Sequence, residues 1–187
     1  IDLPKMNSSK KVLGVIRPTT EIVGKFSKTK HVGVLGTAGT ISSESYPIEI
    51  AKFFPEIKVF QEACPLWVPM VENNEYESES VDVIIQENLK TLFSKSEKID
   101  TIILGCTHYP LLINKIKKHL PENVTLLSQG EIVAKSLSAY LMRHSETEKI
   151  CSKGKKIEFF TTGSTEHFDT HAGIFLDRSV KSRHIAL

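Results

Sequence analysis

The chain contains 187 residues with a formal net charge of +2, and 40% of the residues are hydrophobic and 25% are charged. This length predicts one large domain or two small ones, and the composition is typical of a globular protein that can bury a core. Because the net charge is small, nucleic acid and anionic membranes are not expected partners. No apolar run approaches the roughly 20 residues that a membrane-spanning helix needs.

The three cysteines, Cys64, Cys106 and Cys151, are an odd and sparse set. Such a set argues against a disulfide framework and fits the reducing cytoplasm. No pair of cysteines or histidines has the spacing of a zinc site, so we expect no metal ion.

Short β-rich segments alternate with amphipathic helical segments, and this alternation predicts a parallel α/β sheet. The predicted strands are residues 11–16, 31–35, 58–62, 101–104, 124–127 and 157–162, with a short final strand at 184–187. The predicted helices are residues 18–26, 45–53, 81–93, 111–120, 130–143 and 165–176. The polar segment 145–154 is predicted to be a loop.

Three polar segments follow predicted strands, and ligands bind at the carboxyl ends of the strands in an open parallel sheet. The first is GTAGT at residues 36–40. Its glycines permit a tight turn, and the hydroxyls of Thr37 and Thr40 with nearby N–H groups can hold a carboxylate. These five residues alone slightly favour the alternative, an ordinary strand-to-helix turn with a threonine cap.

The second segment, ACPLWVPMVE at residues 63–72, is apolar until its last residue. We expect Cys64 to pack as a small hydrophobic residue, and Trp67 and Met70 to lie in a wall or in the core. Glu72 is a candidate to orient a histidine or relay a proton. Taken alone, however, a solvated carboxylate at a helix end is its more common role.

The third segment, GCTHYP at residues 105–110, combines a thiol, a hydroxyl and an imidazole directly after an apolar strand. A helix start stabilises a thiolate and lowers the cysteine pKa from about 8.5. His108 can add positive charge or move a proton. The alternative is a buried structural cysteine with a capping threonine, but the position at a strand end favours a reactive Cys106.

The motifs LGTAGT, ACPLWVPMVE and GCTHYPLL, in this order and spacing, closely resemble the second half of glutamate racemases. GVIRPTTE is similar to the segment that joins the two lobes of that family, and FFTTGSTEHF is similar to its closing strand and helix. The resemblance covers about residues 12–187. It implies a flavodoxin-like lobe, with a parallel sheet flanked by helices, and the C-terminal part of a second similar lobe.

The resemblance also implies interconversion of L- and D-glutamate without a cofactor or metal, supplying D-glutamate for peptidoglycan in the cytoplasm. In this family each lobe provides one cysteine, because inversion of a carbon needs a base and an acid on opposite faces. The site must also stabilise the developing carbanion. We expect glutamate as the substrate and a homodimer as the candidate assembly.

The residue roles that follow from the resemblance centre on GCTHYP. Cys106 matches the second catalytic cysteine, and Thr107 and His108 match the substrate-contacting residues beside it. Glu72 matches the carboxylate that partners the histidine in some members. The matches to threonines that line the site are Thr37 and Thr40.

The Asp-Ser-Gly, Pro-Tyr-Gly and Ala-Cys-Asn-Thr motifs of the family do not occur in the chain. Cys64 cannot replace the missing thiol, since it belongs to the same lobe as Cys106. We therefore expect a family member without its N-terminal part that is inactive alone. The expected parts are a remnant or linker (1–17), a complete lobe (18–122) and a segment that returns to the first lobe (123–187).

Two other interpretations remain open. The first is a relative in the same superfamily, such as an aspartate racemase or a one-cysteine decarboxylase, although ACPLWVPMVE together with GCTHYP favours glutamate. A non-catalytic one-lobe binding module would explain the missing motifs, but the intact Cys106 and His108 argue against it.

Overall fold

The computed structural model describes residues 12–154 and 156–186. These residues form two compact units, one ending at Ala139 and the other beginning at Tyr140. Helix α8 (Gln129–Arg143) contains the division. Within the described ranges, no helix is long and apolar enough to cross a membrane.

The first unit is built on a four-stranded parallel sheet in the order β2-β1-β3-β4. Its strands are β1 (His31–Gly36), β2 (Lys58–Ala63), β3 (Thr101–Leu104) and β4 (Thr125–Leu127). This order is that of a doubly wound, flavodoxin-like sheet, in which the connections reverse direction between β1 and β3. The predicted fold class is therefore confirmed.

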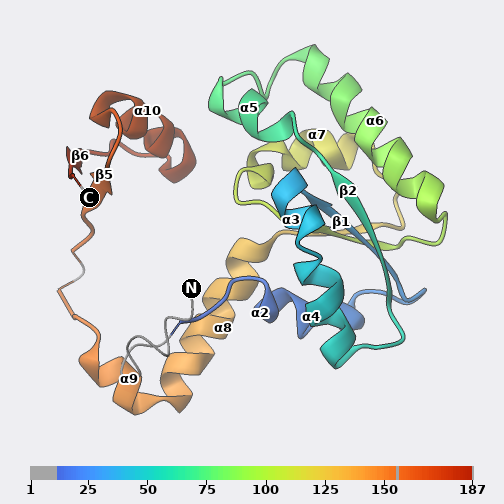
Figure 1. Ribbon diagram of the computed structural model, residues 1–187, viewed down its shortest axis with the longest axis horizontal. Coiled ribbons are helices and arrows are strands. Elements are labelled where there is room, and N and C mark those ends of the chain that lie inside the picture. The colour runs from blue at the N-terminus through green and yellow to red at the C-terminus, as the bar shows by residue number, and fades with distance from the viewer. Residues whose placement is uncertain (1–11, 155, 187) are drawn as a thin grey trace. The chain divides into compact units, whose positions relative to one another are not determined.

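Helices cover both faces of this sheet (Figure 1). Alternate strand residues point to opposite faces, so Val34 and Ile103 pack toward η1 and α4, whereas Leu35 and Leu104 pack toward α5, α6 and α7. The bounds of the helices are α2 (Arg17–Thr20), η1 (Val23–Lys25), α3 (Ala38–Ser42), α4 (Ser45–Phe53), α5 (Trp67–Glu72), α6 (Glu79–Lys95), η2 (Tyr109–Leu112) and α7 (Ile113–Lys118).

Leu92 of α6 packs directly against β1 at Gly33. A Cβ added at Gly33 would lie 2.8 Å from Cδ2 of Leu92. Leu92 and Ile85 of α6 are fully buried. The apolar stripe predicted for residues 81–93 therefore faces the sheet, and glycine in the strand permits its close approach.

The second unit contains α9 (Ser145–Ile150) and a βαβ arrangement formed by β5 (Phe159–Thr161), α10 (Thr165–Leu176) and β6 (Ser182–His184). The strands β5 and β6 pair in parallel. Ser164 caps α10 by accepting a hydrogen bond from the His167 N–H, as its residue type predicts.

Several predicted elements differ from the structure. The expected helix at 18–26 forms two short helices, α2 and η1, with residues 21 and 22 outside both. Residues 12–16 form no strand, because Ile16 instead starts α2 and accepts hydrogen bonds from the N–H groups of Thr19 and Thr20; Lys11 lies outside the described residues. The expected loop after residue 144 contains α9, a polar helix with acidic residues in its first turn, where they favour the helix dipole. The final strand lies at 182–184, in register with β5, and residues 185 and 186 form no strand; Leu187 lies outside the described residues.

The structure also bears on the expected boundary after residue 122. Strand β4 lies beyond that boundary, yet it pairs with β3 through the register Thr101–Thr125. The first compact unit accordingly extends to Ala139. The expected return of residues 123–187 to another lobe stays a prediction.

Candidate active site

The three polar segments singled out in the sequence follow three adjacent strands of the sheet. Backbone hydrogen bonds join their starts: Gly105 N–H donates to the Leu35 carbonyl at 2.7 Å, and Cys64 N–H donates to the Gly36 carbonyl at 2.8 Å. The segments therefore begin side by side at the carboxyl edge of the sheet. This edge includes the reversal between β1 and β3, which is where ligands bind in doubly wound sheets.

The side chains of Cys106, His108 and Glu72 form a chain of contacts at this edge. The Cys106 Sγ lies 3.7 Å from the His108 Nδ1, and the His108 Nε2 lies 2.5 Å from the Glu72 Oε1. Because a carboxylate only accepts, the Nε2 of His108 carries the proton in this contact, which leaves Nδ1 facing the thiol. The expected partnership of Glu72 with a histidine is present in the structure.

Local packing fixes the second and third segments to each other. The Tyr109 hydroxyl donates to the Cys64 carbonyl at 3.1 Å, and the rings of Trp67 and Tyr109 lie 4.7 Å apart. All three residues are fully buried. The bulky residues beside Cys106 and before Glu72 thus form one apolar block that carries both functional groups.

Gly105 allows Cys106 to approach the neighbouring strand. A Cβ at this position would lie 3.0 Å from the Leu35 carbonyl oxygen and 3.1 Å from the Tyr46 ring. A larger residue would push the β3 end away from β1. The glycine before the cysteine is therefore required by this close packing.

The first segment is both a turn and a helix cap. The Thr37 hydroxyl accepts a hydrogen bond from the Thr40 N–H at 3.2 Å, and the two threonine hydroxyl oxygens lie 3.0 Å apart. The threonine-cap interpretation is therefore confirmed. It is compatible with ligand binding, since the first turn of a helix presents N–H groups that anions accept.

Burial separates the three thiols in their chemistry. Cys64 is fully buried, and desolvation, with the nearby charge of Glu62, raises its pKa well above the usual value. Cys151 is exposed, and Cys106 is partly exposed. Cys64 is thus held as a thiol within the core, as expected, and Cys106 is the thiol with both access and an imidazole partner.

Two residues of this edge were not anticipated from the sequence. Burial raises the pKa of Tyr46 to about 12. A hydrogen bond with Gln129 lowers this pKa in part, and the charge of Cys106 raises it slightly further. The Gln129 amide donates to the Leu104 carbonyl at 2.9 Å. Neither residue belongs to a recognisable motif. The one signal in the sequence is the position of Gln129, which follows the predicted strand 124–127 with only Ser128 between them.

The remaining predicted site residue, Thr107, is exposed. In the part of the chain that the structure describes, no group of three or more His, Cys, Asp or Glu residues could hold a metal ion. The arrangement that does exist is a thiol, an imidazole and a carboxylate in line. The Nδ1 of His108 can take the Cys106 proton, and Glu72 stabilises the imidazolium that results.

A parallel flavodoxin-like sheet with this thiol site at its reversal defines a class of α/β proteins with a cysteine-based active site. Comparison with known proteins narrows the class. The chain is 34% identical over 177 residues to a glutamate racemase of Levilactobacillus brevis, covering 94% of this chain and 63% of the relative. It is 41% identical over 159 residues to a glutamate racemase of Listeria monocytogenes, covering 84% and 58%.

Solved structures agree. A glutamate racemase isoform of Bacillus anthracis superposes with a TM-score of 0.84 at 34% identity, covering 100% of this chain and 69% of that one. A glutamate racemase of Francisella tularensis, solved with D-glutamate, superposes with a TM-score of 0.81 at 27% identity, covering 99% and 66%. A scan against protein-family models found no match.

The chain belongs to the glutamate racemase family. It spans 58–63% of the length of the curated relatives named above.

Proposed function

We propose that the protein of which this chain is part is a glutamate racemase, which interconverts L- and D-glutamate without a cofactor. In this role it supplies D-glutamate for peptidoglycan synthesis in the cytoplasm. The observation that carries the proposal is the contact chain Cys106–His108–Glu72 at the reversal of the sheet, in a member of this family. The relative solved with D-glutamate supports the choice of substrate.

Cys106 acts on the α-carbon from one face of the substrate. As a thiolate it removes the α-proton, and as a thiol it returns a proton to the same face. His108 takes or gives the thiol proton through Nδ1, and Glu72 stabilises its charged form. The α-proton is much less acidic than a thiol, so the developing negative charge must be stabilised by N–H groups and hydroxyls.

Substrate binding falls to the neighbouring hydroxyls. We assign Thr37, Thr40 and Thr107, with His108, to contacts with the substrate carboxylates. The proposal is supported by the placement of Thr37 and Thr40 after the end of β1, because β1 pairs with β3, the strand that precedes Cys106. The N–H groups at the start of α3 add donors for an anion.

We assign the second thiol that inversion requires to neither Cys64 nor Cys151. Cys64 is buried within the same block as Trp67, and Cys151 is exposed in the second unit. We therefore propose that the 187-residue chain alone does not racemise glutamate. Its residues 18–122, together with β4 and the first part of α8, would act as the lobe that carries Cys106. Residues 1–17 would act as a linker, and the rest of residues 123–187 as a return to the other lobe. The homodimer stays a prediction.

The proposal is tested by joining the chain to the part of the Levilactobacillus brevis relative that it does not match. Formation of D-glutamate from L-glutamate is followed by chiral chromatography, with L-aspartate as the competing substrate. We expect the chimera to form D-glutamate and the isolated chain not to, and Cys106→Ala in the chimera to lower the rate by at least about a thousandfold. Normal turnover by the isolated chain, or by the Cys106→Ala chimera, would contradict the proposal.

Alkylation of the isolated chain gives a second test that needs no turnover. Iodoacetamide labelling is followed peptide by peptide, so that each cysteine reports on itself. At pH 7 we expect Cys106 to react about tenfold faster than exposed Cys151, and Cys64 to stay unlabelled until the chain unfolds. His108→Ala should slow Cys106 and leave Cys151 unchanged. Equal rates at Cys106 and Cys151 would favour a non-catalytic module.

A further inference from the structure

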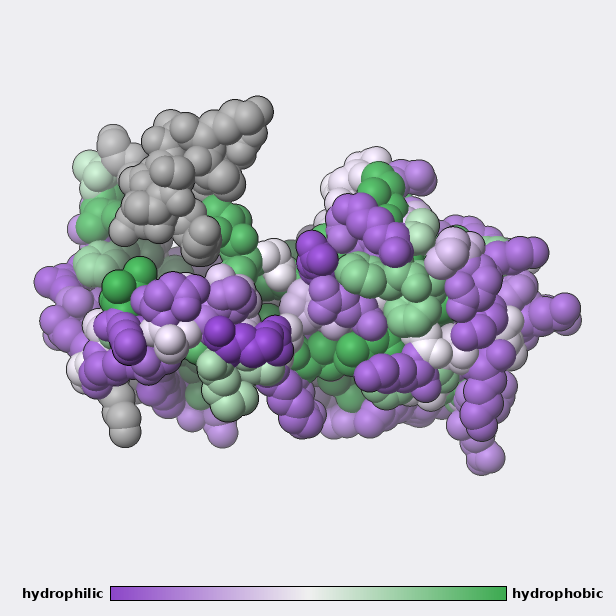
Figure 2. Space-filling view, turned by 90° about the horizontal axis from the view of Figure 1, so that it is seen from below, coloured by the Kyte–Doolittle hydropathy of each residue, from purple (hydrophilic) through white to green (hydrophobic). Residues whose placement is uncertain are grey.

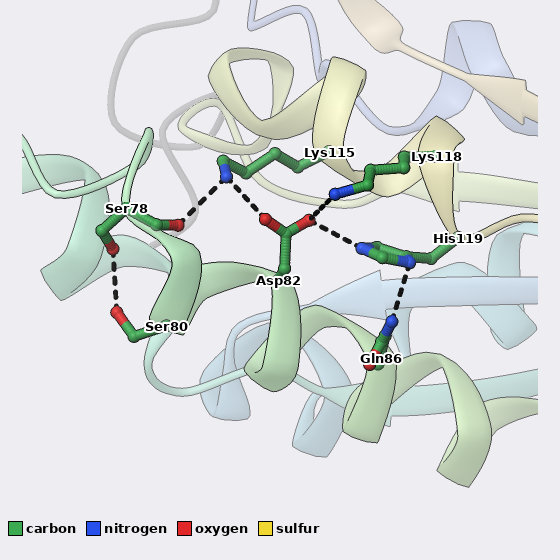
Figure 3. Close-up of polar contacts among 7 residues, drawn as sticks. All are labelled: Ser78, Ser80, Asp82, Gln86, Lys115, Lys118 and His119. Carbon is green, nitrogen blue, oxygen red and sulfur yellow. Dashed lines mark hydrogen bonds and ion pairs between the residues drawn. The ribbon is translucent and has the colours of Figure 1, made fainter.

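A cluster of charged side chains joins α6 to α7 beside the block that carries the site (Figure 3). Asp82 of α6 lies at its centre, with its carboxylate facing Lys115, Lys118 and His119 from the segment at and after α7. The His119 Nε2 lies 2.7 Å from the Asp82 Oδ1, and its Nδ1 lies 3.0 Å from the Gln86 amide nitrogen.

Lys115 and Lys118 differ in the number and closeness of their contacts and in their exposure. Lys115 donates to the Asp82 Oδ2 at 2.8 Å and to the Ser78 carbonyl at 3.0 Å, and its side chain is 16% exposed. Lys118 reaches the Asp82 Oδ1 at 3.5 Å, and its side chain is 66% exposed. Lys115 therefore makes a charge-assisted bridge between a backbone carbonyl and a carboxylate, whereas Lys118 makes a loose surface contact.

The bridge connects the two segments that carry the active-site pair. Ser78, at the N-cap of α6, follows Glu72 by six residues, and Lys115 follows His108 by seven. The residues between Glu72 and Ser78 are joined by short-range backbone hydrogen bonds, including Glu75 N–H to the Met70 carbonyl at 2.9 Å and Ser78 N–H to the Glu75 carbonyl at 2.8 Å. Movement at Ser78 is thus transmitted to the end of α5.

This connecting segment contacts the core through the partly buried Tyr76. Asn73, Asn74, Glu75 and Glu77 are exposed, and Asn74 has a left-handed backbone with φ of 59°. The core holds α5 through the buried Trp67, Met70 and Val71, and Val71 directly precedes Glu72. The Lys115 bridge at Ser78 adds a polar anchor on the other side of Glu72 along the chain.

We propose that Lys115 is a positioning residue, which holds the Glu72 carboxylate in line with the His108 Nε2 by tying Ser78 and Asp82 to α7. The inference rests on the proposed function, in which His108 must present Nδ1 to Cys106. The 2.5 Å contact between His108 and Glu72 is short and directional, so a shift of the carboxylate changes both the orientation of the imidazole and the stability of its charged form.

The experiment compares Lys115→Met, which keeps the apolar stem, with Lys115→Arg, which keeps the charge. Lys118→Met is the matched control, because it removes the same charge from the same helix and the same carboxylate but leaves the Ser78 contact. Proton NMR of the isolated chain follows the His108 Nε2 proton, identified by its loss in His108→Ala and its shift in Glu72→Gln. The rate of Cys106 alkylation, followed peptide by peptide between pH 5 and 10, measures how the substitution changes the reactivity of the thiol.

We expect Lys115→Met to move or broaden the His108 proton and to slow Cys106 alkylation at pH 7 by about fivefold to tenfold. Lys115→Arg should restore most of both signals, and Lys118→Met should change the rate by less than about twofold. If Lys115→Met does not melt cooperatively, Asp82→Asn serves in its place. This substitution keeps the size of the side chain and removes the carboxylate that holds the Lys115 ammonium group. The same changes in smaller degree are then expected.

An unchanged His108 proton in Lys115→Met, or equal effects of Lys115→Met and Lys118→Met, would overturn the positioning role while leaving the proposed function intact. The opposite failure is also distinguishable. A wild-type Cys106 that reacts no faster than Cys151 would contradict the proposed function, and the positioning role would fall with it.

Discussion

The two compact units differ in how much of their apolar surface is buried. In the first unit the sheet lies between two clusters of buried side chains that include Trp67, Ile102 and Leu112. Among the described residues of the second unit, Val180 is the only apolar side chain in the buried class. Its exposed apolar residues are Met142, Ile150, Ile157, Phe160, Phe175, Leu176 and Ile185. Figure 2 shows such hydrophobic residues as green areas among the hydrophilic surface.

The difference shows that helices and strands can form in a segment that buries few apolar side chains. The second unit forms β5, α10 and β6 with the expected helix cap and strand pairing. A two-stranded sheet with one helix cannot bury enough apolar surface to be stable by itself. Local sequence pattern thus forms these elements, while few of the described apolar side chains in this unit are buried to hold them together.

Hydrogen exchange on the whole chain tests this contrast most directly. Amides of β1 and β3 should exchange through global unfolding, with protection of about 5–15 kcal/mol. Amides of β5 and β6 should be protected by no more than about 1–2 kcal/mol. Mass spectrometry of peptic fragments checks both at once. Protection of β5 equal to that of β1 would show that the second unit is as stable as the first.

A matched pair of leucine truncations sharpens the comparison. Leu92 near the end of α6 is fully buried, and Leu176 at the end of α10 is 44% exposed. Leu92→Ala leaves a cavity against β1 and should cost about 2–5 kcal/mol of unfolding free energy. Leu176→Ala should cost less than about 1 kcal/mol, because little surface is desolvated there. Urea denaturation measures both, and similar costs would remove the distinction between the units.

The same contrast explains how far the sequence could predict the fold. Residues 45–53 and 165–176 were predicted as helices with the bounds they have, because Pro47 and Ser164 are strong local start signals. Residues 11–16 were predicted as a strand from their apolar, β-rich composition. A strand needs a neighbour, however, and Val12, Leu13 and Val15 are exposed. Pairing partners are a property of the whole sheet and cannot be derived from one segment.

For the candidate site, the sequence predicted which segments carry the site better than it predicted the side-chain contacts between elements. Cys106 and His108 were identified from their place after a strand, and Glu72 from its motif. The roles of Tyr46 and Lys115 depend on contacts between helices that are distant in sequence, Lys115 lying 37 residues from Ser78. No local pattern encodes such a contact. The catalytic and substrate-binding roles themselves stay predictions that the proposed experiments address.

The smallest effect we predict is a change of melting temperature with pH, and it comes from charge rather than packing. The comparison is between Asp82 of the first unit and Glu148 of the second. Hydrogen bonds from Lys115 and then His119 lower the pKa of Asp82 below its usual range, whereas Glu148 forms an exposed ion pair with Lys153. A carboxylate with a lowered folded pKa contributes stability above its unfolded pKa of about 3.9, and this contribution is lost as the pH falls toward the folded value.

Asp82→Asn should therefore lower the melting temperature at pH 7, and its curve should approach that of the wild type as the pH falls below about 4. Glu148→Gln should match the wild type throughout, because exposed pairs contribute little. Thermal melts from pH 7 to pH 2 at low salt measure the effect. A gap between Asp82→Asn and the wild type that does not narrow between about pH 4 and pH 2 would mean that Asp82 acts through its shape rather than its charge. The bridge to Lys115 would then hold α7 by packing alone.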